Sequence, residues 1–461
     1  MLCIDGVGEW ATTTIWHGQG SRLRQLAELR FPHSLGLLYS AFTYFCGFKV
    51  DSGEYKLMGL APYGRPRCAD LIRERLIDVK PDGSFRLDLR HFEFLRGQVM
   101  TGASFERLFG GPWRLPESPL TEREFDLAAS VQEVTEDVTL RLARTARRLT
   151  GETRPCMAGC VALNCVANGR LLGDEVFDDL WVQPAAGDAD CALGAALAVA
   201  ADRGTTRAHV GTGRDAMRGA LLGPAYCDDE IVAFLRERRI PYTRLDPDGL
   251  VRRVVAALVE GQVVGWFQSR MEFGPRALGT RSILGDPRDP GMQSRMNLKI
   301  KFRESFRPFA PSVLMEDTVR FFDLRHESPD MLLVAGVAGE HRRHTISEGL
   351  TGLDLLHQPR STIPAVTHID FSARVQTVAE QTNPLYHRLL TAFKQATGCP
   401  FLVNTSFNLR GEPIVNTPDD AYTCFMRSDI DILAMGGCLL EKAQQPAWSE
   451  ARDWRKAIPL D

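Results

Sequence analysis

The residues best suited to chemistry lie in two basic clusters in the second half of the chain. The first, Met271–Arg288, threads three arginines among three glycines and two prolines, directly after the apolar run Val263–Phe267. Glycine lets a backbone approach a ligand closely, proline fixes the direction of a turn, and arginine presents a planar fork of donors to phosphate or carboxylate. The second cluster, Lys299–Ser312, follows closely. Together they predict one anion-binding pocket, although a solvated arginine-rich loop has the same composition.

Six cations from this half of the chain could converge on phosphate groups through charge-assisted hydrogen bonds. They are Arg276, Arg281, Lys301, Arg303, Arg307 and Arg374. A polar segment follows a predicted strand at Pro400–Val403, and strand ends are the usual place for ligand contacts in open sheets. The amide and hydroxyl groups of Asn404, Ser406 and Asn408 could recognise an uncharged polar group such as a carbamoyl or a ribose; a plain turn is the alternative.

Two glycine-flanked acids stand beside apolar segments in the first half. Asp5 opens the sequence Asp-Gly-Val-Gly-Glu, and Asp188 follows Gly187. Aspartate beside glycine at a strand end suits a nucleotide phosphate with its metal ion. Each pair is equally consistent with an ordinary turn.

Bulk properties exclude several classes of protein. The 461 residues allow two or three domains, and the formal net charge of −3 gives no general attraction to nucleic acid or to a membrane surface. No apolar run approaches the ~20 residues of a membrane helix, and the N-terminus lacks the features of a signal peptide. The eleven cysteines include no Cys-x-x-Cys pair. Reduced, mostly buried thiols in a cytoplasmic protein are therefore expected, rather than disulfides or a zinc site.

The order of apolar and turn residues predicts an α/β protein in two parts. A strand at residues 1–5 and another near 12–16 precede a buried helix over 32–48. Apolar residues at helical spacing predict a helix over 127–149, and small residues over 184–200 predict a helix packed closely on a sheet. Residues 71–120 are less regular and are interpreted as an insertion or cap region.

A change of composition after residue 201 predicts a linker at 206–227, followed by a second domain at 228–445 and a peripheral tail at 446–461. Within the second domain the patterns predict helices over 230–238, 250–259 and 419–426, and strands over 331–337, 400–403 and 430–435.

Taken together, these segments resemble the O-carbamoyltransferase family of natural-product and nodulation-factor biosynthesis. The resemblance extends over nearly the whole chain. The matching segments are Tyr55–Gly64, Gly159–Asn164, Met271–Arg288, Lys299–Ser312, Thr367–Val378, Asn404–Asn408 and Gly411–Val415.

The resemblance implies a fold and an activity. Residues 1–205 would form a partial actin/hexokinase-like domain, similar to that of the tRNA threonylcarbamoyl transferases, and residues 228–445 a YrdC-like α/β domain. The YrdC-like domain would make carbamoyl adenylate from carbamoyl phosphate and ATP. The carbamoyl group would then pass to a hydroxyl of a small molecule of the antibiotic or nodulation-factor type.

The resemblance also implies the roles of individual residues. Lys301, Arg307 and Ser406 would be catalytic, and Asp5 and Asp188 would be two ligands of a divalent metal, iron(II) by analogy with the family. Carbamoyl phosphate and the nucleotide would be held by Arg276, Arg303, Arg374, Asn404, Asn408, Gly159 and Asn164.

The chain also departs from the family pattern. Family members begin with a further subdomain of roughly one hundred residues that carries a His-x-x-x-His metal pair, and this sequence contains no such pair. We therefore expect an incomplete metal site and a missing N-terminal subdomain. A truncated or inactive fragment, a binding subunit, a homodimer and a partner for a separately encoded N-terminal half are the alternatives. Two other activities are weighed against this one. Carbamoyl transfer in hydrogenase maturation would require Cys-x-x-Cys zinc fingers, which the sequence lacks, and transfer to tRNA would require a basic surface, which the net charge of −3 disfavours.

Overall fold

The computed structural model describes residues 1–20, 22–205, 215–343, 352–358 and 360–448. The chain divides into two compact units: one contains residues 1–208 with 348–357, and the other contains most of residues 209–460. Both combine helices with β-sheets, which confirms the predicted α/β class. Among the described residues, no helix is long and apolar enough to cross a membrane.

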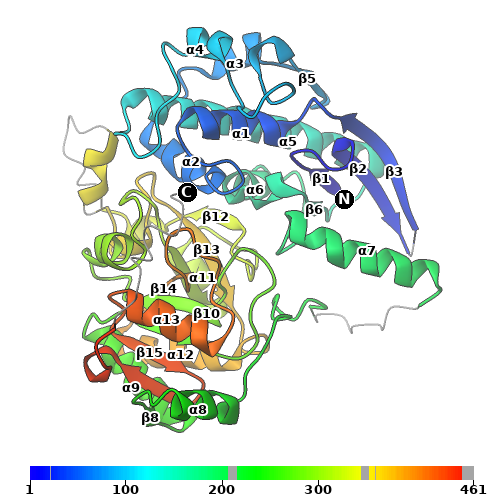
Figure 1. The fold of residues 1–461 in the computed structure, drawn as a ribbon. Helices are drawn as coiled ribbons and strands as arrows, with labels where there is room; N and C mark the ends of the chain where they lie inside the picture. Colours follow the sequence, from blue (N-terminus) through cyan, green and yellow to red (C-terminus); the bar gives the residue numbers. More distant parts are fainter. Residues whose placement is uncertain (21, 206–214, 344–351, 359, 449–461) are drawn as a thin grey trace. The chain divides into compact units, whose positions relative to one another are not determined.

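The first unit is built on a five-stranded sheet in the order β3-β2-β1-β6-β7. β1 pairs antiparallel with β2 and parallel with β6, β2 pairs antiparallel with β3, and β6 pairs parallel with β7. The strands are β1 (Leu2–Ile4), β2 (Ala11–Gln19), β3 (Arg22–Arg30), β6 (Cys156–Ala158) and β7 (Trp181–Val182). A long β2–β3 hairpin thus lies beside three short strands (Figure 1).

The predicted helix over 127–149 is confirmed as α5 (Glu122–Thr150), the longest helix of this unit. It begins earlier than predicted because Thr121 and Glu124 form a capping box, and it ends where Gly151 adopts a left-handed φ of 72°. α5 packs against α1, α2 and α6 (Figure 1). The other helices are α1 (Leu35–Phe45), α2 (Glu54–Leu60), α6 (Cys165–Gly173) and α7 (Asp188–Asp202).

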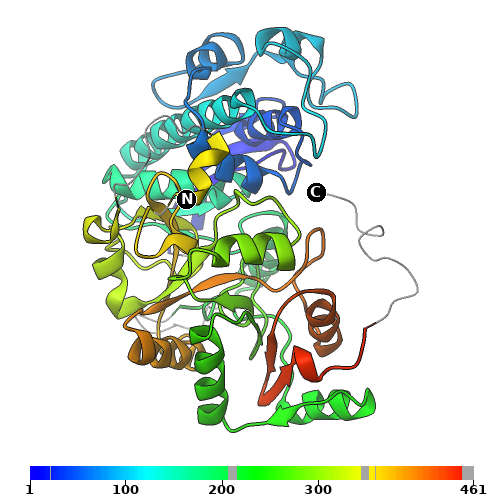
Figure 2. The same ribbon diagram turned by 90° about the vertical axis from the view of Figure 1, so that its left-hand side faces the viewer.

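The segment predicted as an irregular insertion has regular structure of its own. It contains α3 (Ala69–Arg75), the hairpin of β4 (Ile77–Val79) and β5 (Phe85–Leu87), and α4 (Ala103–Leu108). Aromatic rings join it to α1: the Phe105 ring lies 5.1 Å from that of Phe42 and 5.0 Å from that of Phe45. Figure 2 shows this segment in blue and cyan beside α5.

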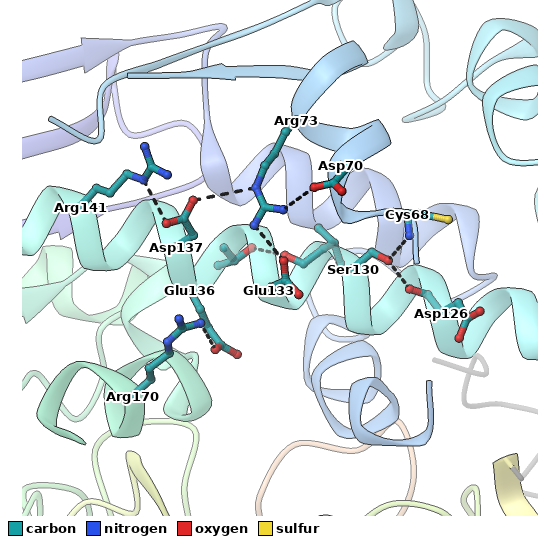
Figure 3. Close-up of polar contacts among 12 residues, drawn as sticks. Cys68, Asp70, Arg73, Asp126, Ser130, Glu133, Glu136, Asp137, Arg141 and Arg170 are labelled. Atoms are coloured by element: carbon teal, nitrogen blue, oxygen red, sulfur yellow. Dashed lines mark hydrogen bonds and ion pairs between the residues drawn. The ribbon is translucent and has the colours of Figure 1, made fainter. Parts of the chain in front are cut away.

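Ion pairs fix α3 on α5 (Figure 3). Arg73 contacts Asp70 on its own helix at 3.4 Å and reaches Glu133 at 2.9 Å and Asp137 at 3.9 Å on α5. The backbone N–H of Cys68 donates to Ser130 Oγ, 3.0 Å away. These partly exposed pairs contribute mainly as a network, since isolated surface ion pairs add little stability.

The second unit is built on a nine-stranded mixed sheet in the order β12-β13-β11-β14-β10-β9-β15-β16-β8. The strands are β8 (Thr243–Arg244), β9 (Val264–Phe267), β10 (Arg281–Gly285), β11 (Ala310–Leu314), β12 (Leu333–Gly336), β13 (Ser372–Val378), β14 (Phe401–Ser406), β15 (Ile432–Met435) and β16 (Cys438–Glu441). The predicted strands at 331–337, 400–403 and 430–435 are confirmed with shifted ends. β10 and β13 were not predicted as strands.

The helices of the second unit pack on this sheet. α9 and α12 pack together and contact β9, β15, β11 and β14, while α8 and α13 pack together and contact β9, β15 and β16. The helices are α8 (Asp228–Glu237), α9 (Pro247–Val259), α10 (Met292–Arg295), α11 (Thr318–Phe321), α12 (Pro384–Thr397) and α13 (Pro418–Arg427), with a π-helix at Met296–Ile300. The predicted cap Asp228 is replaced by Cys227, which forms a capping box with Glu230.

Candidate anion-binding site

Strand β14 carries the polar segment at the centre of the candidate site. Asn404 and Ser406 stand two residues apart, so their side chains leave the same face of the sheet. β14 runs between β11 and β10, with Ala310 paired to Asn404 on one side and Ser282 paired to Ser406 on the other. β14 extends to Ser406, beyond the predicted strand, and Asn408 lies in the turn that follows.

The ammonium group of Lys301 joins this segment. Its Nζ donates to the backbone oxygens of Ser406 and Asn408, each at 2.8 Å, to Ser406 Oγ at 3.2 Å and to Asn408 Oδ1 at 2.5 Å. Ser406 Oγ in turn donates to Asn408 Oδ1 at 2.7 Å. Lys301, Ser406 and Asn408, which are predicted to act together, are therefore in direct contact, although Lys301 lies more than one hundred positions before the other two.

Two opposing effects act on the charge of Lys301. Burial lowers the pKa of its side chain well below the ordinary value, and the nearby charges of Arg303 and Arg307 lower it further. The four oxygens around Nζ favour the ammonium form, because it has three N–H donors and they are acceptors. These four acceptors are neutral, and Glu412, whose nearby charge raises the pKa of Lys301, is itself ion-paired with Arg427 at 3.0 Å. A bound phosphate would add negative charge beside the ammonium group.

The loop after Lys301 presents Arg303 and Arg307. Its shape depends on Asn297, which is fully buried and was not singled out from the sequence. Asn297 Oδ1 accepts from Arg303 Nε at 2.7 Å, and Nδ2 donates to the backbone oxygens of Ser305 at 3.2 Å and Arg307 at 2.9 Å. The Arg303 guanidinium also lies 4.8 Å from the centre of the Phe309 ring.

Arg276 lies on a loop that closes on a buried carboxylate. Oε1 of Glu272 accepts from the backbone N–H groups of Leu278 at 2.7 Å, Thr280 at 2.8 Å and Arg281 at 3.3 Å. Glu272 is 4% exposed and Arg276 is 8% exposed. The Glu272 carboxylate therefore closes the loop that carries Arg276.

An amide network joins this loop to the sheet. Gln376 Nε2 donates to Leu278 O at 2.8 Å, and Gln376 Oε1 accepts from Ser312 Oγ and from Asn404 Nδ2, the latter at 3.0 Å. Asn404 Nδ2 also donates to Ala277 O at 3.0 Å. These carbonyl acceptors fix the orientation of the Asn404 amide. Asn404 Oδ1 is left buried without a hydrogen-bond partner among the described residues. A buried acceptor of this kind suits an N–H donor on a ligand.

Arg281 and Arg374 occupy different environments. Arg281 is fully buried, its guanidinium lies 3.7 Å from the centre of the Phe267 ring, and Nη1 donates to Gln268 O at 2.7 Å. Burial lowers the pKa of Arg281 to about 10. Arg281 therefore lies buried inside the loop and bonds to backbone oxygens, instead of being placed for phosphate as the sequence predicts. Arg374 lies on β13 two residues before Gln376, and therefore on the same face.

The first-unit candidates gather around the end of β1. Asp5 Oδ1 accepts from the backbone N–H groups of Gly6 at 2.8 Å and Cys160 at 3.1 Å. Gly159 has a φ of 87°, and a Cβ there would lie 2.3 Å from Ile4 O, so only glycine fits against β1. Burial raises the pKa of the Cys160 thiol, with Asp5 and then Asp188 adding to the effect, which indicates that these groups are close.

Asn164 has structural partners. Its Oδ1 accepts from Ala167 N at 3.1 Å and so caps α6, and its amide exchanges two hydrogen bonds with Gln132 of α5. Its predicted contact with a nucleotide remains a prediction.

The predicted metal site has few ligands. Asp188 occupies the first turn of α7, and one oxygen of Asp5 is already engaged by two backbone donors. Among the residues that the structure describes, no group of three or more histidine, cysteine or acidic side chains could hold a metal ion. Two carboxylates could hold a divalent ion only together with ligands from a bound nucleotide or water. The predicted metal site remains a prediction.

Family models match both halves of the chain. The model described as "Carbamoyltransferase N-terminus" matches residues 1–197, and that described as "Carbamoyltransferase C-terminus" matches residues 255–442. The expectation that the N-terminal part of the family is missing is not borne out by the first match.

Several known proteins are similar to the chain. An uncharacterized protein of Synechocystis sp., sll1178, is 54% identical over 465 residues, covering 100% of this chain and 75% of its own. Nodulation protein NolNO of Sinorhizobium fredii is 37% identical over 97% of this chain and 62% of its own. A 3'-hydroxymethylcephem-O-carbamoyltransferase of Streptomyces clavuligerus is 32% identical over 80% of this chain and 61% of its own. The chain thus spans less than two thirds of the last two proteins.

Proposed function

Because the chain belongs to the carbamoyltransferase family, we propose that it moves a carbamoyl group from carbamoyl phosphate to a hydroxyl of a small molecule, using ATP. In the first step the second unit forms carbamoyl adenylate. Water attacks the phosphorus of carbamoyl phosphate, which breaks the P–O bond and releases phosphate and carbamate. A carbamate oxygen then attacks the α-phosphorus of ATP, and pyrophosphate leaves. In the second step the acceptor oxygen attacks the carbamoyl carbon in the first unit, AMP leaves, and the hydroxyl proton is lost.

The strand orders support the finer assignment of the two units. In the first unit, three antiparallel strands are followed by two parallel ones in the order β3-β2-β1-β6-β7, which supports an actin/hexokinase-like core. The large mixed sheet of the second unit supports the YrdC-like assignment. Fold likeness alone does not fix an activity, so the proposal depends on the site.

The observation that carries the proposal is the buried ammonium of Lys301, hydrogen-bonded to neutral oxygens, with Arg303 and Arg307 on the adjoining loop. A buried cation of this kind favours an anionic ligand, and phosphate fits the donors of lysine and arginine. Asn404 Oδ1 provides a buried acceptor near Arg276, suited to the N–H groups of a carbamoyl. The site thus combines donors for a phosphate with an acceptor for an amide.

Pyrophosphate release tests the first step. The purified chain is incubated with ATP, with and without carbamoyl phosphate, and both pyrophosphate and phosphate are measured. We expect equal amounts of the two products only when both substrates are present. Carbamoyl phosphate binding measured by calorimetry without pyrophosphate release would instead indicate a binding subunit. An absence of both would contradict the proposal.

The acceptor of the second step is proposed by class. One relative is named for transfer to a 3'-hydroxymethyl group on a cephem, and others are named as nodulation proteins. A panel of small molecules with primary hydroxyl groups, assayed for carbamoylated product by mass spectrometry, would identify the class. Formation of carbamoyl adenylate without any carbamoylated product in the panel would remove these hydroxyl compounds as acceptors.

A further inference from the structure

The segment that leads into the second unit is bound to the loop that carries Arg276. We call residues 215–224 the connector; in the sequence it directly follows residues 206–214 and lies inside the predicted linker. The composition of this region predicts a linker. The structure instead packs the connector into the second unit, where it forms main-chain pairs with residues 271–273.

Three backbone hydrogen bonds make this pairing. Phe273 N donates to Ala220 O at 2.7 Å, Gly223 N donates to Met271 O at 2.9 Å, and Met271 N donates to Pro224 O at 2.9 Å. They lie on both sides of Glu272, whose carboxylate holds Leu278 N and Thr280 N. The connector therefore holds the backbone from which Glu272 closes the Arg276 loop.

Two arginine side chains reinforce the pairing. Arg270 Nη1 donates to Gly223 O at 2.9 Å, and Arg281 Nη2 donates to Pro224 O at 3.3 Å. Arg281 also donates to Gln268 O at the end of β9. The connector is thus joined to both ends of the loop, before Met271 and at Arg281.

The connector holds an uncommon backbone conformation. Arg218, Gly219 and Ala220 have φ values of 52°, 64° and 60°, a left-handed run that is unfavourable for each residue other than glycine. Asp215 stabilises the turn by accepting from Met217 N at 2.8 Å and Gly219 N at 2.6 Å.

The run places Ala220 in the core. Ala220 is fully buried and clusters with Leu278, Ala310 and Met331. Leu278 is the residue whose N–H binds Glu272 and whose carbonyl binds Gln376. The left-handed turn therefore supports the same residue that anchors the Arg276 loop to the sheet.

We infer that the connector is a positioning element for Arg276, so that the segment joining the two units sets the affinity of the second unit for carbamoyl phosphate. The inference rests on the proposed function for the identity of the ligand. The connector residues act through Glu272 and Leu278 and need not touch the substrate. The connector continues in the sequence toward the first unit, and it is bound to the loop that we propose holds the substrate of the second unit.

A single methyl group tests this role. A Cβ at Gly223 would lie 2.8 Å from Met271 O and 2.9 Å from Met271 Cβ, so Gly223→Ala displaces the loop backbone. We expect the KM for carbamoyl phosphate to rise about tenfold or more, because displacing the loop weakens the charge-assisted hydrogen bonds of Arg276 to the substrate. The KM for ATP and the melting temperature should change little. Gly339→Ala, in the same unit with nothing within 4 Å of its added methyl, is the matched control.

Hydrogen exchange provides a second test that does not depend on turnover. Carbamoyl phosphate, or inorganic phosphate as a simpler probe, should slow the exchange of amides in both residues 218–224 and 271–281 of the intact chain. Protection of residues 271–281 alone, or of neither segment, would overturn the inference. An unchanged KM for carbamoyl phosphate in Gly223→Ala would also overturn the inference. This holds even if part of the variant fails to fold, because the KM does not depend on the amount of active enzyme.

The two failures can be told apart. If the wild-type chain binds carbamoyl phosphate and protects both segments but releases no pyrophosphate, the proposed function fails and the connector retains its role. If it releases pyrophosphate but Gly223→Ala behaves as Gly339→Ala does, the proposed function stands and the inference fails.

Discussion

The two units position their candidate residues in different ways. In the second unit, Lys301, Asn404 and Glu272 are almost fully buried, and each is held by side-chain hydrogen bonds. In the first unit, Asp5 is partly exposed and α7, which begins at Asp188, has no buried residue. Buried polar groups require fixed partners, whereas exposed ones can be satisfied by water. The second unit therefore holds its candidate residues in fixed positions.

This comparison predicts that the two units can be disabled separately. Lys301→Met should lower carbamoyl-phosphate-dependent pyrophosphate release by about 100-fold or more, since charge-assisted hydrogen bonds contribute ~1.5–3 kcal/mol each. Asp5→Asn should leave pyrophosphate release within about twofold, a difference below ~0.5 kcal/mol. Lys299→Met, two residues from Lys301 and exposed, is the matched control. An equal loss in Lys301→Met and Asp5→Asn would break the comparison.

The difference in burial should also appear in stability. Asn297→Ala removes three hydrogen bonds from a fully buried side chain and should destabilise the loop at 301–309 by about 3 kcal/mol, at ~1 kcal/mol for each bond. Asn164→Ala also removes three hydrogen bonds, but from a partly exposed side chain whose partners water can satisfy, so it should cost about 1 kcal/mol, the typical loss of a helix cap. Hydrogen exchange of each unit's amides measures both effects without assuming two-state unfolding. A larger loss in Asn164→Ala would reverse the predicted order.

Asn404 should determine selectivity for the carbamoyl group. In acetyl phosphate a methyl group replaces the amide, so Asn404 Oδ1 would have no donor to accept from. We expect Asn404→Ala to reduce the preference for carbamoyl over acetyl phosphate by about tenfold, because leaving one buried acceptor unpaired costs ~1–3 kcal/mol. The ratio of the two kcat/KM values is the measurement, and it is insensitive to loss of active protein. An unchanged ratio would remove Asn404 from recognition of the amide.

The smallest effect concerns pH. Burial, and then the charge of Asp215, raises the pKa of Asp330 from 3.8 to about 7. Between these values the unfolded chain has lost a proton that the folded chain keeps, so stability falls as pH rises through this window. The stability of Asp330→Asn relative to wild type should therefore grow from pH 4 to pH 7 and then level off. Thermal melts across this range test it, with the exposed Asp248→Asn as control; a constant difference would contradict the prediction.

Local sequence patterns predicted much of the fold. α5 could be predicted because its apolar residues recur at helical spacing, and β14, β15 and α13 because turn residues bound short apolar runs. The pattern did not predict β10, since Arg281–Gly285 reads as part of a glycine-rich loop although all five residues are buried. It also missed the regular structure between α2 and α5, whose short elements are stabilised by packing against α1 and α5.

The sequence by itself determined the family, through motifs spread along the chain, and its clustered arginines and lysines beside glycines predict an anion site. Only the tertiary structure decided which side chains share that site. Gln376 meets Ser312 and Asn404 because neighbouring strands bring together residues far apart in the chain, and the end of the π-helix brings Lys301 to Ser406 and Asn408. The same packing buried Arg281 and bound residues 215–224, part of the predicted linker, to the second unit. Hydrogen bonds of this kind leave no periodic pattern in the sequence, whether they join distant residues, as at Gln376 and the connector, or fold a nearby loop, as at Asn297, so these three emerged only from the fold.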